Sequence, residues 1–217
     1  MRSYKAVCFD FDYTLGDCTK SILAGFRHAL PVMGYEAPED EAIRATIGYL
    51  LEDAYTMLTG DADPEHRARF RPIYSRVATQ NQIEEAKLFP GAEKLIHALN
   101  RAGVRTAIVS SRRAETTRAI MERFHLNELL PVVLGSTDVK KPKPDPQGLL
   151  IAMERLEVRP EEVLFCGDTV LDAGAARGAG CDFAAVLNGT TKAEAFAEFS
   201  PVHIAPDLVE LAEWLGF

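Results

Sequence analysis

From about residue 88 onward, the chain alternates between strand-like and helix-like segments. Residues 104–109 and 163–166 are short apolar runs, and amphipathic stretches of about ten residues lie between such runs. This alternation is typical of strand–helix–strand units, which build parallel sheets with right-handed crossovers. We therefore predict an α/β fold with a parallel sheet. The expected strands are residues 6–9, 104–109, 131–134, 163–166 and 183–187, and the expected helices are 92–102, 114–124, 146–156, 173–179 and 208–215.

Residues 19–85 differ from the rest of the chain, because they show helical periodicity and no convincing strand. Ile22, Phe26 and Leu30 recur at helical spacing, and Pro31 is expected to end or kink this first helix. A chain of 217 residues is long enough for one large domain with a smaller insertion. We expect a core formed by residues 1–15 and 86–217, and a helical insertion formed by residues 16–85.

The composition limits the partners of the chain. Its formal net charge of −8 argues against a nucleic-acid surface, which usually shows clustered Lys and Arg. The N-terminal residues run directly into a strand and resemble neither a signal peptide nor a membrane span. We therefore expect a cytoplasmic protein without a membrane partner, either a monomer or a homodimer.

Two carboxylates, Asp10 and Asp12, follow the apolar run of residues 6–9. A run of this kind indicates a buried central strand, and open α/β sheets bind ligands beyond the carboxyl ends of their strands. The two carboxylates would repel each other there unless a cation lies between them. The alternative is an exposed acidic turn.

Three further strand ends or loops carry polar residues. Ser110 follows residues 108–109, and Lys141 lies in a proline-rich loop that the prolines stiffen. Asp168 and Asp172 are four residues apart after the strand 163–166, so a helix would place them on one face. Taken singly, Ser110 and Asp168 are also compatible with helix caps, and Lys141 with a solvated turn.

Together these groups, in this chain order, resemble the haloacid dehalogenase superfamily of phosphohydrolases. Residues 10–14 match its DxDxT motif, Ser110 its Ser/Thr motif, Lys141 its lysine motif, and residues 167–172 its GDxxxD motif. The resemblance implies a Rossmann-like core with an α-helical cap inserted after the first motif, here residues 16–85. The overall layout most resembles the phosphoglycolate phosphatase group.

The resemblance also implies a mechanism. Asp10 would be the nucleophile that forms an aspartyl-phosphate, and Asp12 would protonate the leaving oxygen and later activate water. Mg²⁺ would bind the Asp10 carboxylate, the Asp12 backbone carbonyl and the Asp168 carboxylate. Asp172 would act in the outer shell of the metal.

The remaining motif residues would handle the phosphate. Lys141 would screen the nucleophile from the substrate, and Ser110 would hold the transferring oxygens. The candidate contacts to the substrate, a small phosphorylated metabolite, are Thr14, Ser111 and Arg44.

Other activities remain open at this point. The acid at Asp12 favours phosphoryl transfer over dehalogenation, and Tyr13 departs from the glycine common at that position. The alternatives are a sugar phosphomutase similar to β-phosphoglucomutase, an inorganic pyrophosphatase, and a non-enzymatic phospho-receiver or binding protein. A receiver domain has roughly 120 residues and lacks a cap, so the helical insertion counts against it.

Overall fold

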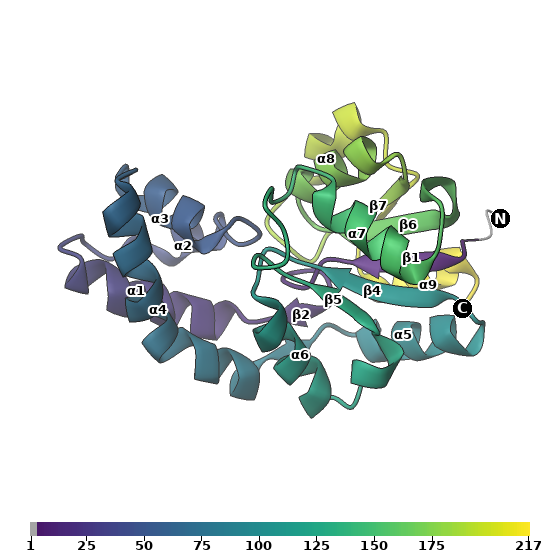
Figure 1. Cartoon of the computed structure of the whole chain (residues 1–217), viewed down its shortest axis with the longest axis horizontal. Coiled ribbons are helices and arrows are strands. Elements are labelled where there is room, and N and C mark those ends of the chain that lie inside the picture. The colour runs from purple at the N-terminus through teal and green to yellow at the C-terminus, as the bar shows by residue number, and fades with distance from the viewer. Residues whose placement is uncertain (1–3) are drawn as a thin grey trace.

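The computed structural model describes residues 4–217 and confirms the α/β fold. Its main sheet has six parallel strands in the order β5-β4-β1-β6-β7-β8 (Figure 1). The central strand β1 is therefore hydrogen-bonded on both sides, to β4 and to β6. The strand bounds are β1 Ala6–Phe9, β4 Arg105–Val109, β5 Val132–Leu134, β6 Val163–Gly167, β7 Asp182–Val186 and β8 His203–Ala205.

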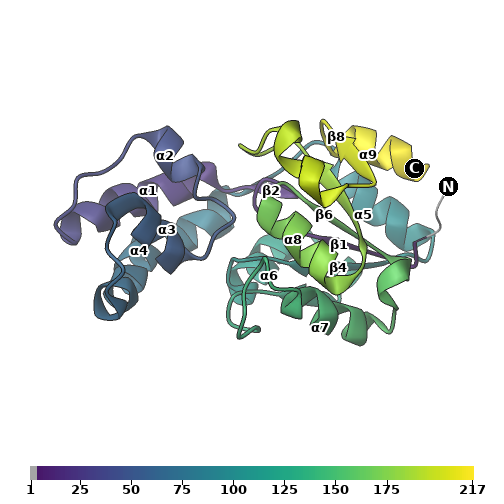
Figure 2. The same cartoon turned by 90° about the horizontal axis from the view of Figure 1, so that it is seen from above.

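Helices cover both faces of this sheet. Side chains alternate along β1, so Val7 and Phe9 join the apolar cluster on one face, and Ala6 and Cys8 join the cluster on the other. Burial on both faces explains why the strand is apolar throughout. Helices α5, α6 and α9 lie on the first face, and α7 and α8 lie on the second (Figures 1 and 2). Their bounds are α5 Ala92–Arg101, α6 Ala114–Arg123, α7 Gln147–Leu156, α8 Val170–Ala179 and α9 Leu208–Leu215.

Four helices between strands β2 (Gly16–Asp17) and β3 (Lys87–Leu88) form a helical insertion beside the sheet (Figure 2). They are α1 Thr19–Val32, α2 Asp40–Arg44, α3 Leu51–Thr59 and α4 Pro64–Glu85. An aromatic cluster joins them: the Phe26 ring lies 5.6 Å from Phe70 and 5.1 Å from Tyr74. Asp63 caps α4 by accepting hydrogen bonds from two backbone N–H groups, and the helix continues through Pro72. Pro31 lies in the last turn of α1, where the expected helix end is found.

The chain enters and leaves the helical insertion at one place. Strand β2 (Gly16–Asp17) pairs antiparallel with β3 (Lys87–Leu88), and Phe89 N–H donates to the Leu15 carbonyl at 2.9 Å. Gly16 is required there, because a Cβ atom would lie 2.4 Å from the Phe11 ring. The two connections therefore run side by side next to the end of β1.

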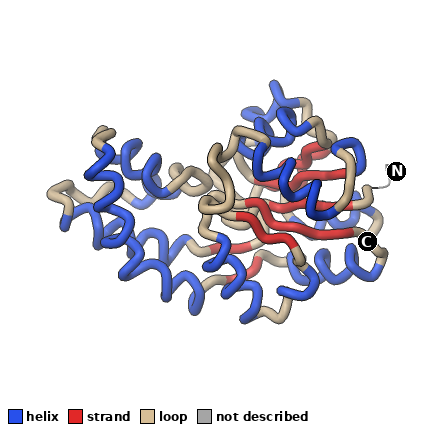
Figure 3. Tube along the Cα trace, in the orientation of Figure 1, coloured by secondary structure: helices blue, strands red, loops and turns tan. Residues whose placement is uncertain are grey.

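The sequence expectations for the sheet and its helices hold to within three residues at each element boundary. The two-stranded pair β2–β3, the edge strand β8 and the 3₁₀ turns at Asn127–Leu129, Pro160–Glu162 and Ala193–Phe199 were not expected. Figure 3 shows the strands gathered in one part of the molecule and the helical insertion apart from them. Among residues 4–217, every helix is too short or too polar to cross a bilayer.

Candidate active site

The strand order brings three sequence-distant side chains to the same edge of the sheet. Asp10 follows β1, Ser110 follows β4, and Asp168 follows β6. Strands β4, β1 and β6 are neighbours and parallel, so their carboxyl ends lie next to one another. All three side chains are buried. The predicted convergence of Asp10, Ser110 and Asp168 at the strand ends is therefore found in the structure.

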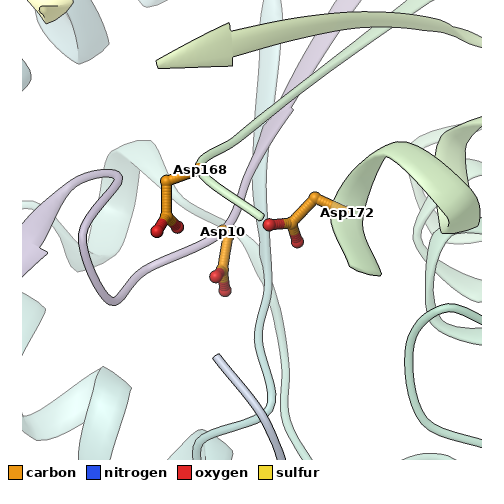
Figure 4. A group of neighbouring side chains, drawn as sticks. All are labelled: Asp10, Asp168 and Asp172. Atoms are coloured by element: carbon orange, nitrogen blue, oxygen red, sulfur yellow. The ribbon is translucent and has the colours of Figure 1, made fainter. Parts of the chain in front are cut away.

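Three carboxylates form a buried cluster at this edge. Asp10, Asp168 and Asp172 each place one carboxylate oxygen within 4.8 Å of the others (Figure 4). Asp172 comes from the first turn of α8, which begins directly after β6. We call these three residues together with Lys143 the carboxylate cluster.

The lysine of this site is Lys143, and the expectation of Lys141 was wrong. Lys143 Nζ lies 3.0 Å from Asp10 Oδ1 and 2.6 Å from Asp172 Oδ1, and its side chain is 5% exposed. Lys141 Nζ lies 3.9 Å from Asp145 on the surface, with its side chain 74% exposed. Only Pro142 separates these lysines, and the loop turns only Lys143 toward the sheet edge.

Burial and mutual repulsion dominate the electrostatics of the carboxylate cluster. Burial raises the pKa of Asp10 to about 7, although Lys143 opposes the shift. Burial, followed by the charges of Asp172 and Asp10, raises the pKa of Asp168 well above its usual range. For Lys143, burial acts to lower the pKa, but Asp10 and Asp172 outweigh it and raise the value, so the ammonium stays charged.

Asp172 serves the local fold as well as the cluster. Its Oδ2 accepts hydrogen bonds from the Thr169 backbone N–H at 3.0 Å and from the Thr169 hydroxyl at 2.6 Å. The Thr169 hydroxyl in turn accepts from Asp172 N–H at 3.3 Å, which completes a capping box at the start of α8. Asp172 Oδ1 accepts a hydrogen bond from Lys143 Nζ at 2.6 Å. Both of its oxygens are therefore engaged within the protein.

The carboxylate cluster fits a hard divalent cation. Asp10 Oδ1 is buried and has no hydrogen-bond partner among residues 4–217, although Lys143 forms an ion pair with it. Asp168 Oδ1 accepts a hydrogen bond from Thr14 at 3.2 Å, and a Cβ atom at Gly189 would lie 2.2 Å from Asp168 Oδ2. Carboxylate oxygens are the ligands that Mg²⁺ and similar cations prefer. Because both oxygens of Asp172 are engaged, Asp10 and Asp168 are the candidate ligands for such an ion.

Asp12 lies in different surroundings, next to an arginine that the sequence reasoning missed. Arg112 Nε donates to Asp12 Oδ2 at 3.0 Å, and its Nη2 donates to Asp12 Oδ1. Arg112 Nη1 donates to Gln82 Oε1 at 2.6 Å, and Gln82 Nε2 donates to the Tyr74 hydroxyl at 3.0 Å. We call these four residues the arginine bridge. An arginine two residues after Ser110 is the sequence signal that could have identified it.

A cleft between the helical insertion and the sheet edge opens onto both groups. Its lining includes Asp10, Asp12, Ser110, Ser111 and Arg112, and it encloses about 730 Å³ together with the solvent at its mouth. Ser110 Oγ accepts a hydrogen bond from Arg112 N–H at 3.3 Å. The expected residues Ser110 and Ser111 therefore face the same space as the two aspartates.

Two of the expected substrate contacts have other partners in this structure. The Thr14 hydroxyl contacts Asp168, as described above. Arg44 does not line the cleft; its Nη1 donates to the Tyr13 hydroxyl at 3.3 Å, and the Thr19 hydroxyl donates to the same atom at 3.0 Å. Tyr13 has a left-handed backbone, with φ at 57°, which explains why a glycine suits this position. Its ring connects the first motif to α1 and α2.

Comparison with known proteins agrees with this geometry. Residues 7–186 match the family described as haloacid dehalogenase-like hydrolase. A phosphoglycolate phosphatase of Nitrosospira multiformis is 31% identical over 211 residues, which cover 95% of this chain and 93% of the relative. A phosphoglycolate phosphatase of Vibrio parahaemolyticus is 27% identical over 98% of this chain and 96% of its own. A crystal structure from Bacteroides fragilis, assigned to the haloacid dehalogenase-like hydrolases, has 35% identity and a TM-score of 0.93, with 96% of this chain and 100% of the other covered.

Proposed function

The chain belongs to the haloacid dehalogenase-like hydrolases and is a phosphatase, and from this premise we propose that it hydrolyses small phosphomonoesters through an aspartyl-phosphate on Asp10. The observation that carries the proposal is the state of Asp10. Its carboxylate lines the cleft, its Oδ1 lacks a hydrogen-bond partner among the described residues, and Lys143 lies 3.0 Å away. A carboxylate that is held in place but not consumed by hydrogen bonds can act as a nucleophile.

The residues of the site supply each step of the proposed reaction. A carboxylate oxygen of Asp10 attacks phosphorus, and the bond between phosphorus and the leaving oxygen breaks while Asp12 gives that oxygen a proton. In the second step Asp12 takes a proton from a water molecule as the water attacks phosphorus. The bond to Asp10 then breaks, and inorganic phosphate and the original carboxylate are restored. Each turnover thus consumes one water molecule.

A divalent cation, which we propose to be Mg²⁺, would neutralise the charge that gathers on the phosphoryl oxygens. Asp10, Asp168 and the backbone carbonyl of Asp12 would hold it, and Asp172 would support it from the outer shell. Lys143 takes the role first assigned to Lys141, because its buried ammonium lies between Asp10 and Asp172. Ser110, at the end of β4, would hold a phosphoryl oxygen.

The cleft supports a small substrate, with residues 16–85 acting as a cap. The cap side of the cleft carries apolar and hydroxyl side chains, and its Arg71 is already paired with Glu52. On the core side, Arg113 lines the mouth with its side chain 49% exposed. Phosphoglycolate is the first candidate substrate, because the similar proteins described above carry that name. Ser111 is retained as a candidate contact to its phosphate.

The test is phosphate release from 4-nitrophenyl phosphate, phosphoglycolate and a panel of sugar phosphates, with Mg²⁺ and with EDTA, for the wild type and Asp10→Asn. We expect Mg²⁺-dependent turnover and a loss of at least about 10⁴-fold in the variant, since removing a nucleophile removes the covalent route. Asp10→Asn keeps the shape of the side chain, so its thermal unfolding should show a folded protein.

Three results would count against the proposal. Turnover that persists in Asp10→Asn would show that Asp10 is not the nucleophile. Turnover that persists in EDTA would show that the reaction does not require a divalent cation. An isomerised sugar phosphate without phosphate release would indicate a mutase instead.

A further inference from the structure

Arg112 occupies an unusual position for an arginine, because it is buried between two parts of the molecule. It lies in the loop between β4 and α6, and its side chain is 7% exposed. Two of its nitrogens, Nε and Nη2, donate to the two oxygens of Asp12. This two-point contact fixes the plane of the carboxylate as well as its distance, which a lysine could not do.

The third nitrogen of the guanidinium reaches the helical insertion. Nη1 donates to Gln82 on α4 at 2.6 Å, and Gln82 is 6% exposed and donates to Tyr74 at 3.0 Å. Gln82 lies in the last turn of α4, just before the chain returns to the sheet at β3. The guanidinium of Arg112 therefore contacts both Asp12 in the core and α4, the last helix of the insertion.

The charge of Arg112 makes this link rigid. Burial acts to lower the pKa of Arg112, but the Asp12 carboxylate outweighs it and raises the value, so the guanidinium is permanently charged. The guanidinium also lies over the Phe11 ring, 5.6 Å from the ring centre. A buried ion pair with satisfied hydrogen bonds holds its geometry, because separating the charges is costly in a low dielectric.

We propose that Arg112 is a positioning residue that orients Asp12 for proton transfer, and that Gln82 makes this orientation depend on the position of the helical insertion. The inference rests on the proposed function, in which Asp12 is the acid and base. When the insertion lies over the sheet edge, the guanidinium is held at three points. When it moves away, Gln82 withdraws and Asp12 loses part of the support that aims it.

This role predicts a dependence on the leaving group that a purely structural role does not. An alkoxide needs a proton as it leaves, whereas 4-nitrophenolate leaves without one, so a misplaced acid harms alkyl esters more. A general loss of packing or of phosphate binding would harm both esters alike. Both esters share the hydrolysis of the aspartyl-phosphate, so the ratio of their kcat/KM values, which report the first step, isolates the orientation of Asp12 as the acid.

The experiment compares kcat and KM for 4-nitrophenyl phosphate and glycerol 2-phosphate, with Mg²⁺, in Arg112→Met, Arg112→Lys and Gln82→Leu. We expect Arg112→Met to lower kcat/KM for the alkyl ester about 10-fold or more beyond its effect on the aryl ester, within the range of general acid catalysis. Arg112→Lys should restore part of this ratio, and Gln82→Leu should change it in the same direction by less.

Arg123→Met is the matched control. Arg123 donates to the Glu84 carbonyl at 2.7 Å and to the Ala86 carbonyl, so it fixes the same linker from the core without contacting Asp12. We expect it to leave the ratio of the two esters unchanged. If Arg112→Met does not fold, Arg112→Lys and Gln82→Leu carry the comparison alone.

Equal losses of kcat/KM on both esters in the Arg112 and Gln82 variants would overturn the inference and leave the proposed function intact. A gain in turnover in these variants would overturn the inference too, because the contact with Arg112 would then hinder proton transfer by Asp12. A wild type that turns over neither ester would instead contradict the proposed function, and the inference with it.

Discussion

The carboxylate cluster and the arginine bridge start from aspartates only two residues apart, yet their surroundings are opposite. In the cluster, three carboxylates face the single cation Lys143, which leaves two excess negative charges when all are ionised. In the bridge, the single carboxylate of Asp12 has a cation of its own, Arg112. The chain turns at Asp12 and the residues after it, because the N–H groups of Thr14, Leu15 and Gly16 all donate to the Phe11 carbonyl.

This difference separates two tasks within one short motif. A carboxylate such as Asp10, which shares Lys143 with Asp172, suits a divalent cation and a phosphoryl group. A compensated and doubly hydrogen-bonded carboxylate such as Asp12 suits a fixed position. The same residue type thus receives two properties from its neighbours, and not from its own chemistry.

The largest effect is expected from Lys143→Met, which removes the only cation of the carboxylate cluster. We expect turnover of 4-nitrophenyl phosphate to fall by about 10³-fold, as for other preorganised charges in active sites. The metal-free protein should also lose roughly 3 to 5 kcal/mol of unfolding free energy, because Asp10 and Asp172 remain buried without it. Steady-state kinetics and urea unfolding measure the two effects.

Lys141→Met is the control for that experiment. Its ammonium is on the surface, so turnover and stability should stay near those of the wild type. A large loss in Lys141→Met with a small loss in Lys143→Met would reverse the assignment of the lysine.

The pH dependence of stability sharpens the comparison at Asp10. Burial raises the pKa of Asp10 from 3.8 to about 7, so the folded protein keeps this proton to a higher pH than the unfolded chain. The contribution of Asp10 to the free energy of unfolding therefore falls as pH rises from about 4 to about 7, by about 1.4 kcal/mol for each unit of pKa difference. Mg²⁺ favours the carboxylate and should reduce this fall.

Urea unfolding across that pH range, with Mg²⁺ and with EDTA, tests the expectation, and Asp10→Asn serves as the reference that cannot titrate. The wild type should lose stability relative to Asp10→Asn as the pH rises in EDTA. Parallel curves for the two proteins in EDTA would show that Asp10 has no raised pKa.

The smallest effect is expected at the contact between the first motif and the helical insertion, from Tyr13→Phe. The change removes the hydroxyl that accepts from Thr19 and Arg44 but keeps the buried ring. We expect about 1 kcal/mol less unfolding free energy and little change in turnover of 4-nitrophenyl phosphate. A loss of activity near that of Lys143→Met would mean that this contact, too, belongs to the chemistry.

The sequence was sufficient to predict the elements of the fold, because they depend on local patterns. Residues 6–9 and 163–166 are apolar runs, and burial on both faces of a central strand requires such runs. The edge strand β8 was not predicted, because it has three residues and begins with the polar residue His203. The pair β2–β3 has two residues on each side and forms only when segments some 70 residues apart meet, which no local window detects.

The site was predictable up to the choice between neighbouring side chains. Lys141 and Lys143 each precede a proline, so backbone restriction acts on both in the same way and does not distinguish them. Arg112 stands next to Arg113 before a helix, a pattern that indicates a solvated helix start as readily as a buried cation. Which member of each pair turns inward depends on non-local packing.

The pairing of β2 with β3 has a consequence for how proteins of this shape can diversify. The chain enters the four-helix insertion through β2, after β1, and leaves it through β3, before α5. Because β2 and β3 pair with each other, the two ends of the inserted segment are held a fixed short distance apart. The geometry of the sheet therefore does not depend on the length or the fold of the inserted segment. Its substrate-facing wall can be lengthened, shortened or exchanged as a module, while the register of β1 against β4 and β6 remains the same.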